Sequence, residues 1–325
     1  MSSATPGNPD PAMMALRVAR AEPVAEDIRL FELRDPSGAD LPEFSAGSHV
    51  SVRVPSGLIR KYSLCNYPAE RDRYVVAVKR EPDVGRGGSE SMIRDVRPGS
   101  ELPVSVPANN FALVKSAAGY LFVAGGIGIT PIMAMIRHLK ATGERFRLCY
   151  CTRSPAVTAF RDELSGPEFR GQVVIHHDQG DLARALDLWP IVEKPQGRQL
   201  YCCGPRGLMQ AVRDMTGHWS PSAVHFEAFT EAAERKADDK PFTVRLARSG
   251  GTVAVPAGTT ILEALRAKGL EVPSSCESGT CGTCRTRLIA GEADHRDLVL
   301  SEHEHATNIM VCVSRARSDE LVIDR

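Results

Sequence analysis

The chain has 325 residues, enough for two or three domains at about 150 residues per domain. Its 42% of hydrophobic and 25% of charged residues are ordinary for a globular protein and argue against disorder, collagen and coiled coil. The 40 basic and 40 acidic side chains cancel, which argues against a protein built mainly to bind nucleic acid. The sequence contains no apolar run of about 18 residues, so we expect no membrane-spanning helix.

Residues 1–14, MSSATPGNPDPAMM, are small, polar and rich in proline, and they predict a disordered tail. They contain no basic stretch followed by an apolar one, so they do not resemble a signal peptide. We therefore expect a cytoplasmic protein, in which thiols stay reduced. The nine cysteines then need an explanation other than disulfides, and four of them lie in the last 50 residues.

Residues 15–115 predict an antiparallel β-barrel. Val50, Val52 and Val54 alternate with polar residues, which is the period of a half-buried strand. Residues 74–78 form a short apolar run that is typical of a buried strand. Proline and glycine interrupt the segment at short intervals, a pattern of barrels and sandwiches.

Residues 116–229 predict an α/β domain. Two segments carry apolar residues at helical spacing, which predicts amphipathic helices. Alternating strands and helices imply a parallel sheet covered by helices. The expected strands are 120–124, 146–151, 173–175 and 200–203, and the helical faces are Ile132, Met135, Ile136 and Leu139, then Leu208, Ala211, Val212 and Met215.

Residues 230–240, TEAAERKADDK, hold no aliphatic side chain larger than alanine and predict a linker. After it, residues 242–247 and 252–255 predict a hairpin around Gly250-Gly251. Residues 260–268 predict a helix that Gly269 ends. Residues 241–325 thus form a third, smaller α+β domain.

Four cysteines near the C-terminus, Cys276, Cys281, Cys284 and Cys312, have the spacing of plant-type [2Fe–2S] ligands. Two tetrahedral irons need four thiolates that converge from a loop and a remote segment. Glycines 279 and 282 let backbone N–H groups approach the inorganic sulfides. The alternative is a zinc-stabilised scaffold, but such sites usually pair two C-x2-C knuckles and only one is present here.

Two segments of the barrel are candidates for a phosphate-bearing cofactor. In Arg60-Lys61-Tyr62-Ser63, alternate strand residues share a face, so Arg60 and Tyr62 can flank a ligand and the arginine can neutralise a phosphate. Arg86-Gly87-Gly88-Ser89 precedes a predicted helix at 90–96, and its backbone amides suit a phosphate. Taken alone, the first segment is typical of a surface strand and the second of a flexible turn.

The segment Gly125-Gly126-Ile127-Gly128-Ile129-Thr130-Pro131 follows a strand and opens a helix. Thr130 is expected to cap that helix, and Pro131 suits its first position. The glycines let the backbone lie against a pyrophosphate at the helix N-terminus. Proline replaces the third glycine of G-x-G-x-x-G, which argues against a standard Rossmann dehydrogenase. A glycine-rich turn without a ligand is the alternative.

Other candidates follow the later strands. Cys203-Gly204-Pro205 lies between a strand and a helix, although a lone cysteine is more often a core residue. Arg153 can contact an adenosine ribose or, alternatively, the 2′-phosphate of NADPH. Phe226 and Phe229 end the α/β part, where a phenylalanine usually packs in the core, and we keep that interpretation for Phe229.

These motifs resemble one known family. Residues 273–284, PSSCESGTCGTC, resemble the cluster loop of plant-type ferredoxins. GEADHRD at 291–297 and IMVCVSRA at 309–316 resemble the C-terminal ferredoxin domain of the phthalate dioxygenase reductase family. The R-x-Y-S, G-G-x-G-x-T-P and C-G-P segments are similar to those of the ferredoxin–NADP reductase superfamily. The resemblance covers nearly the whole chain after its first 14 residues.

The resemblance implies an FMN-binding barrel, an NADH-binding α/β domain and a β-grasp ferredoxin domain, in that order. It implies electron transfer from NADH through FMN and the [2Fe–2S] cluster to a Rieske-type aromatic ring-hydroxylating or demethylating oxygenase. Residues 86–89 would hold the FMN phosphate, Ser63 would lie near flavin N5 and Cys203 near the nicotinamide. Phe226 would stack beside the flavin ring, and Glu227 would lie near the nicotinamide pocket.

Other functions remain open at this point. A flavin–iron–sulfur redox sensor or regulatory subunit without turnover would carry similar motifs, and a vanillate-type demethylase reductase would look alike. We expect a monomer, because each cofactor fits within one chain, and no nucleic-acid or membrane partner. The aromatic substrate belongs to the oxygenase, which is a separate chain.

Overall fold

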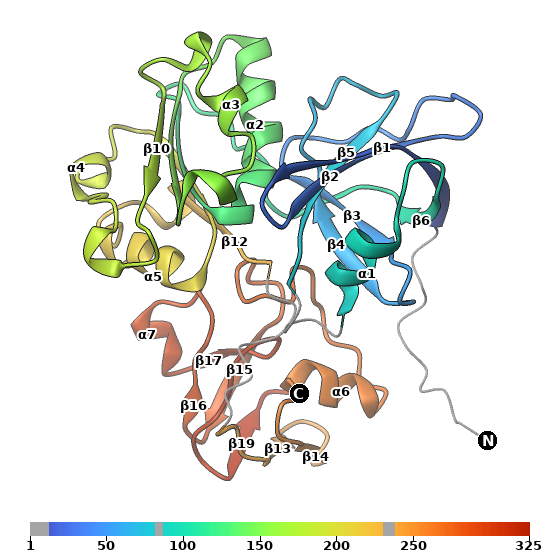
Figure 1. The fold of residues 1–325 in the computed structure, drawn as a ribbon. Coiled ribbons are helices and arrows are strands. Elements are labelled where there is room, and N and C mark those ends of the chain that lie inside the picture. Colours follow the sequence, from blue (N-terminus) through green and yellow to red (C-terminus); the bar gives the residue numbers. More distant parts are fainter. Residues whose placement is uncertain (1–12, 82–86, 230–237) are drawn as a thin grey trace. The chain divides into compact units, whose positions relative to one another are not determined.

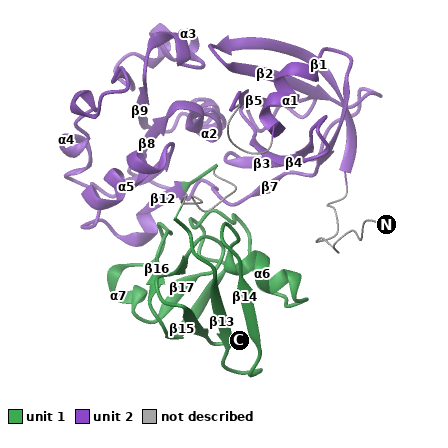
Figure 2. Cartoon of the chain, turned by 60° about the horizontal axis from the view of Figure 1, so that its bottom comes forward, with its two compact units in different colours: residues 1–7, 227–325 green, residues 8–226 purple. Residues whose placement is uncertain are grey.

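The computed structural model describes residues 13–81, 87–229 and 238–325 (Figure 1). These residues divide into two compact units, one that ends at Phe226 and one that begins at Glu227 (Figure 2). No helix in the described ranges is long and apolar enough to span a membrane.

The first part of the N-terminal unit is an antiparallel sheet in the strand order β4-β3-β6-β1-β2-β5, with β7 paired to β3. Its elements are β1 Met13–Ala25, β2 Ile28–Arg34, β3 Ser48–Arg53, β4 Ile59–Ser63, β5 Tyr74–Lys79, α1 Gly88–Asp95, β6 Glu101–Ser105 and β7 Ala108–Asn109. The tail prediction is therefore too long by two residues, since Met13 and Met14 pair with Ser105 and Val104.

A bridge between Leu64, just after β4, and Val76 of β5 joins the two ends of this sheet. The sheet thereby closes into the predicted barrel. Val50 and Val52 point into its core and are fully buried, while the alternate residues Ser51 and Arg53 are only partly buried. The period-two pattern of the sequence is thus confirmed.

The second part is a sheet in the order β10-β9-β8-β11-β12, with parallel pairing from β10 to β11. Its elements are β8 Tyr120–Gly125, α2 Ile129–Thr142, β9 Phe146–Thr152, α3 Arg161–Leu164, β10 Val173–His177, α4 Trp189–Val192, β11 Gln199–Cys203, α5 Arg206–Met215 and β12 Val224–Glu227. Strand β8 is buried along its whole length, as expected for a central parallel strand. The predicted α/β architecture is confirmed.

The barrel and the parallel sheet share one apolar core. Leu30 and Val75 on the outside of the barrel pack in the same cluster as Ile132 and Met133 of α2 and Phe122 of β8. The inward-facing barrel residues form a separate cluster. This shared core explains why the two sheets make up a single compact unit.

The C-terminal unit is a mixed five-stranded sheet in the order β14-β13-β19-β15-β17, with the small pair β16-β18 beside it. Its elements are β13 Phe242–Leu246, β14 Thr252–Val255, α6 Ile261–Ala267, β15 Arg285–Ala290, β16 Ala293–Asp294, α7 Glu302–His305, β17 Asn308–Met310, β18 Arg315–Ala316 and β19 Glu320–Ile323. The expected hairpin is present, and Thr260 caps α6 with Glu263 in a reciprocal capping box.

Candidate functional site

Strand β4 places the R-x-Y-S residues as predicted. Arg60 and Tyr62 share one face, with Tyr62 packed partly against the barrel core, while Lys61 alternates to the other face and is exposed. Ser63 ends the strand and is only 5% exposed. A Cβ at Gly88 would lie 2.6 Å from Nε of Arg60. The structure therefore brings the arginine of this strand against the start of α1.

The start of α1 has the features of an anion site. Gly87 adopts a left-handed conformation, φ +82°, and precedes the helix without a side-chain cap among the described residues. Ser89 Oγ accepts a hydrogen bond from Glu81 N at 3.1 Å. The first-turn N–H groups of α1 and the Arg60 guanidinium suit a phosphate together. Arg86, the fourth predicted residue of this loop, lies outside the described residues.

Two glycine-containing loops meet at the ends of β8 and β11. A Cβ at Gly128 would lie 2.2 Å from the carbonyl oxygen of Cys203, and one at Gly125 would lie 2.6 Å from Cδ of Pro205. Most of these glycines thus permit close approach of the two loops rather than of a ligand. Gly126 is different, because its φ is +53° and nothing lies within 4 Å of its Cβ position. It is the glycine open to a pyrophosphate.

The expected cap of α2 is wrong. The helix begins at Ile129 after the short 3-10 turn Gly126–Gly128, so Thr130 and Pro131 occupy its second and third positions. Thr130 is buried, and its hydroxyl donates to the carbonyl of Ile127 at 3.0 Å. The 3-10 turn extends the helical segment toward the sheet, which places the first open amides at the glycines.

The remaining candidates differ in exposure. Cys203 is fully buried in the core shared with the barrel, whereas Arg153 is exposed beyond the end of β9. Phe226 and Glu227 end β12 and are both half-buried. Phe229 is 40% exposed, so its assignment to the core is wrong. The chain has already left the sheet at Phe229, which explains why no core covers it.

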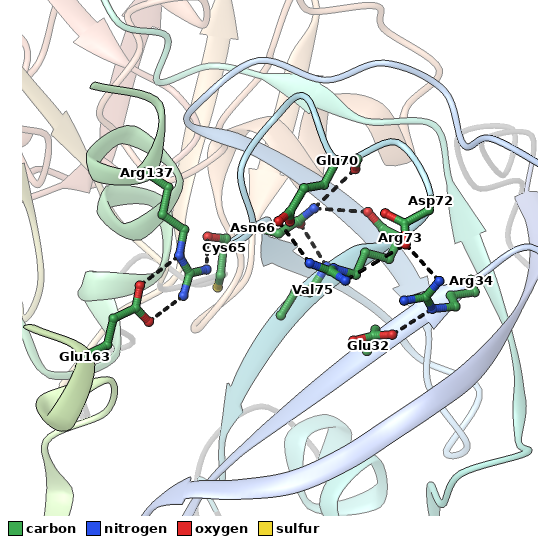
Figure 3. A network of polar contacts seen from close by, with 10 residues as sticks. All are labelled: Glu32, Arg34, Cys65, Asn66, Glu70, Asp72, Arg73, Val75, Arg137 and Glu163. Atoms are coloured by element: carbon green, nitrogen blue, oxygen red, sulfur yellow. Dashed lines mark hydrogen bonds and ion pairs between the residues drawn. The ribbon is translucent and has the colours of Figure 1, made fainter. Parts of the chain in front are cut away.

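A set of polar contacts around Arg137, which the sequence did not reveal, connects α2 to the residues just after β4 (Figure 3). Nη1 of Arg137 donates to the carbonyl of Cys65 at 2.6 Å, while Nε and Nη2 bind the carboxylate of Glu163 at 3.0 and 2.6 Å. Buried Asn66, which follows Cys65, accepts a hydrogen bond at Oδ1 from Val75 N of β5 at 3.0 Å. The contacts of Arg137 thus hold the end of β4 against α2.

The four clustered cysteines lie on two segments. Cys276, Cys281 and Cys284 stand in the loop between α6 and β15, and Cys312 follows β17. Backbone amides already point at sulfur: Cys276 N donates to Cys281 Sγ at 3.5 Å, and Ser278 N donates to Cys276 Sγ at 3.4 Å. Amide–sulfur bonds of this kind surround and tune iron–sulfur clusters.

The thiols interact closely enough to share protons. Within each hydrogen-bonded pair one thiol holds the proton: the pKa of Cys276 and Cys284 is lowered, and that of their partners Cys281 and Cys312 is raised. Thiolate is the form that binds metal. Gly279 adopts φ +74°, and a Cβ there would lie 2.7 Å from Cγ2 of Val313. A loop this tight, with four converging sulfurs and inward amides, fits a [2Fe–2S] cluster.

Charged residues anchor this loop, and the motif gave no sign of them. Nη2 of Arg266 on α6 binds Oε1 of Glu277 at 2.9 Å inside the loop. Arg296 is buried and pairs with Asp239 at 2.5 Å and with Asp294 at 2.6 Å. The sequence placed Asp239 in the linker, yet its side chain is 6% exposed in this network.

The other five cysteines form no disulfide, and four of them are buried. Burial raises the pKa of Cys65 and Cys151 to about 12 and also raises that of Cys149 and Cys202. These thiols therefore stay protonated, as expected for structural cysteines. This agrees with their interpretation as packing residues.

Comparison with known proteins agrees with this division of sites. Residues 15–113 match a family model described as "Oxidoreductase FAD-binding domain". Residues 244–317 match a model described as "2Fe-2S iron-sulfur cluster binding domain". The second match spans all four clustered cysteines.

Full-length relatives extend the match to the whole chain. The phthalate 4,5-dioxygenase oxygenase reductase subunit of Pseudomonas putida is 55% identical over 317 residues, which cover 97% of this chain and 98% of the relative. The chain belongs to the phthalate dioxygenase reductase family. It is therefore a flavin- and iron–sulfur-dependent oxidoreductase of the dioxygenase-reductase type.

Two further relatives show the range of this family. The phenoxybenzoate dioxygenase subunit beta of Ectopseudomonas oleovorans is 45% identical and covers 96% of this chain and 98% of the relative. A solved structure of phthalate dioxygenase reductase, described as modular for electron transfer from pyridine nucleotides to [2Fe–2S], is 54% identical with a TM-score of 0.72. It covers 96% of this chain and 98% of its own. Fold and motif order are thus those of the phthalate dioxygenase reductase family.

Proposed function

We propose that the chain is the NADH-dependent reductase component of a Rieske-type oxygenase that hydroxylates or demethylates an aromatic ring. It passes electrons from NADH through FMN and [2Fe–2S] to that oxygenase. The observation that carries the proposal is the coexistence, in one chain, of an arginine-flanked helix start, an open glycine turn and four converging cysteines. The full-length relatives support the same order of sites.

The barrel residues hold and orient FMN. Arg60, the loop Arg86–Ser89 and the first turn of α1 bind its phosphate, while Tyr62 flanks it and Ser63 hydrogen-bonds the ring near N5. The exposed Lys61 contributes charge at the rim. A flavin held by these residues would supply the chemistry that links the two-electron donor NADH to a one-electron iron–sulfur acceptor.

The α/β residues hold NADH. Gly126 and the N-terminus of α2 face the pyrophosphate, and Arg153 contacts the adenosine ribose. Gly125, Gly128, Thr130 and Pro131 shape this turn, and Gly204 and Pro205 pack against it and set its position. Phe226 and Glu227 would line the nicotinamide pocket and exclude water from it, and Cys203 would form its buried floor at the end of β11.

We also propose three functional domains, with boundaries at 15–115, 116–229 and 241–325 joined by the segment 230–240. The family matches at 15–113 and 244–317 support the outer two. The electron acceptor is a separate oxygenase chain, as the names of the relatives suggest. The reductase itself acts as a cytoplasmic monomer.

Reduction of cytochrome c by NADH tests this proposal. The purified protein with its flavin and iron should reduce cytochrome c rapidly, and the flavin released by heating should be FMN. Absence of any NADH oxidation would favour a sensor or regulatory subunit without turnover. A colourless protein with stoichiometric zinc and no iron would favour the zinc scaffold.

The aromatic system needs a separate comparison of acceptors. Mixing the reductase with a phthalate-type and a vanillate-type oxygenase should give substrate-dependent NADH consumption with the first. Faster coupling to the demethylase would instead assign it to the vanillate-type group.

A further inference from the structure

A cluster of metal-ligand side chains lies in the C-terminal unit, apart from the four cysteines. His295 and Asp297 follow β16, and His305 ends the short helix α7. One ligand atom from each, a nitrogen of both histidines and a carboxylate oxygen, lies within 4.8 Å of the other two. The two imidazole rings are stacked with their centroids 3.9 Å apart and their planes 13° from parallel.

One nitrogen of each imidazole ring is unusual because it is buried and makes no hydrogen bond to the described residues. His295 Nδ1 and His305 Nε2 have no hydrogen-bond partner among the residues that the structure describes. A buried polar atom in that state costs free energy that a ligand recovers. Histidines with a merely structural role usually have such a partner.

The carboxylate of Asp297 is held in place by its own backbone surroundings. Its side chain is fully buried, and Oδ2 accepts the N–H groups of Val299 at 3.0 Å and Leu300 at 2.7 Å. Oδ1 lies 3.9 Å from His295 Nδ1. Ligating carboxylates are typically oriented by hydrogen bonds of this kind from outside the coordination sphere.

The chemistry of the donor set selects a borderline cation. Two imidazoles and one carboxylate are typical ligands of zinc-class metals, whereas magnesium and calcium take oxygen ligands. Burial and the neighbouring His305 lower the pKa of His295, although Asp297 opposes them. Neutral imidazole is the form that binds such a metal.

We propose that His295, Asp297 and His305 form a binding site for one divalent transition-metal ion of the zinc class, separate from the iron–sulfur cluster. Water completes the tetrahedral shell. Both imidazole rings rotate out of their parallel stack when the ion binds, because their lone pairs must converge on one point at about 2.0–2.1 Å.

The position of the site gives it a consequence for the cluster loop. Leu298, between the ligands Asp297 and His305, donates its N–H to the carbonyl of Gly279 at 2.9 Å. Gly279 lies between the ligands Cys276 and Cys281 of the cluster loop. An ion at this site links α7 to the segment that supports the loop, so we expect it to slow the loss of iron.

Calorimetric titration of the untagged holoprotein with zinc chloride tests the proposal, after a chelator has removed adventitious metal. We expect one zinc ion per chain with unchanged visible absorption of the cluster. His305→Gln should weaken zinc binding by at least about 10-fold, since even the loss of an outer-shell partner costs that much. His303→Gln, which changes an exposed histidine on the same helix, should bind zinc as the unmodified protein does.

Three results would overturn the proposal. The unmodified holoprotein could bind no zinc, or His305→Gln could bind it with unchanged affinity and stoichiometry. Zinc uptake accompanied by loss of the cluster absorption would assign the ion to the four cysteines instead. Iron loss under a chelator, followed at the cluster absorption with and without zinc, gives a second readout that does not depend on activity.

Discussion

The two compact units prepare their cofactor sites in different ways. In the N-terminal unit, the key positions are glycines at strand–helix junctions. An added Cβ would lie 2.2 Å from the backbone of Cys203 at Gly128 and 2.6 Å from Arg60 at Gly88. In the C-terminal unit, the key positions are cysteine side chains on a loop that Arg266 holds through Glu277. One unit depends on side chains being absent, and the other on side chains being present.

This difference determines which substitutions each unit should tolerate. A methyl group added at Gly128 displaces two loops at once, because the backbone of Cys203 leaves no space there. The cluster loop should tolerate small changes of volume but not the loss of a thiolate or of a buried charge. The following variants test this contrast.

Cys312→Ser should have the largest effect. It removes one of four ligands, so the protein should lose its cluster and its reduction of cytochrome c. NADH should still reduce the flavin, which can be followed with ferricyanide as acceptor. Cys149→Ser, a buried cysteine outside the cluster, should keep the iron. Loss of flavin reduction in Cys312→Ser would contradict the independence of the two units.

Gly128→Ala should slow flavin reduction by about 100-fold, because misplacement of a reacting group by 1 Å can cost that much. The added Cβ would lie 2.2 Å from the carbonyl of Cys203, so the two nicotinamide loops must separate. Rapid mixing with NADH measures the rate, and the cluster absorption should not change. Gly207→Ala is the matched control, because its Cβ would meet nothing within 4 Å. Equal rates in both variants would refute the close-approach argument.

Arg296→Met should destabilise the C-terminal unit by about 3–5 kcal/mol, because it removes the buried guanidinium that pairs most closely with the carboxylates of Asp239 and Asp294. Urea unfolding followed at the cluster absorption measures this, while flavin fluorescence reports the other unit. Arg248→Met removes an exposed pair with Asp324 and should leave the transition unchanged. Equal shifts at both probes would show that the two units unfold together.

His49 should make the stability of the N-terminal unit depend on pH, and this is the smallest of the expected effects. Burial and the nearby Lys61 lower its pKa to about 4, whereas the unfolded chain has the usual value of about 6.5. The unfolded state therefore binds the proton first, and stability falls as the pH drops below about 6.5. Between about pH 7 and about pH 5 the loss should be about 2 kcal/mol.

Urea unfolding of the unmodified protein and of His49→Gln, followed by flavin fluorescence at both pH values, isolates this effect. The variant should lack that part of the pH dependence. An identical change of unfolding free energy with pH in both proteins would mean that His49 is protonated as easily in the folded as in the unfolded protein.

Most of the fold could be predicted because the signals are local. The alternation of Val50 and Val52 defines a barrel strand, and the apolar positions of α2 follow from helical spacing. The cysteine spacing likewise defines the cluster loop. Each of these patterns is contained in a short segment of the chain.

The remaining features depend on partners that are distant in sequence. Arg137 contacts a carbonyl 72 residues away, and Arg296 pairs with Asp239 at a separation of 57 residues. No local pattern distinguishes such an arginine from a solvated one. The predicted cap at Thr130 is wrong for a different reason, since the 3-10 turn before α2 leads into a helix that begins at Ile129, two residues earlier than predicted.

The most direct test of the account uses protein from which the flavin has been removed while the cluster stays in place. In that protein NADH should no longer reduce the cluster, and added FMN should restore reduction at the original rate. Reduction of the cluster by NADH at an unchanged rate without flavin would contradict it.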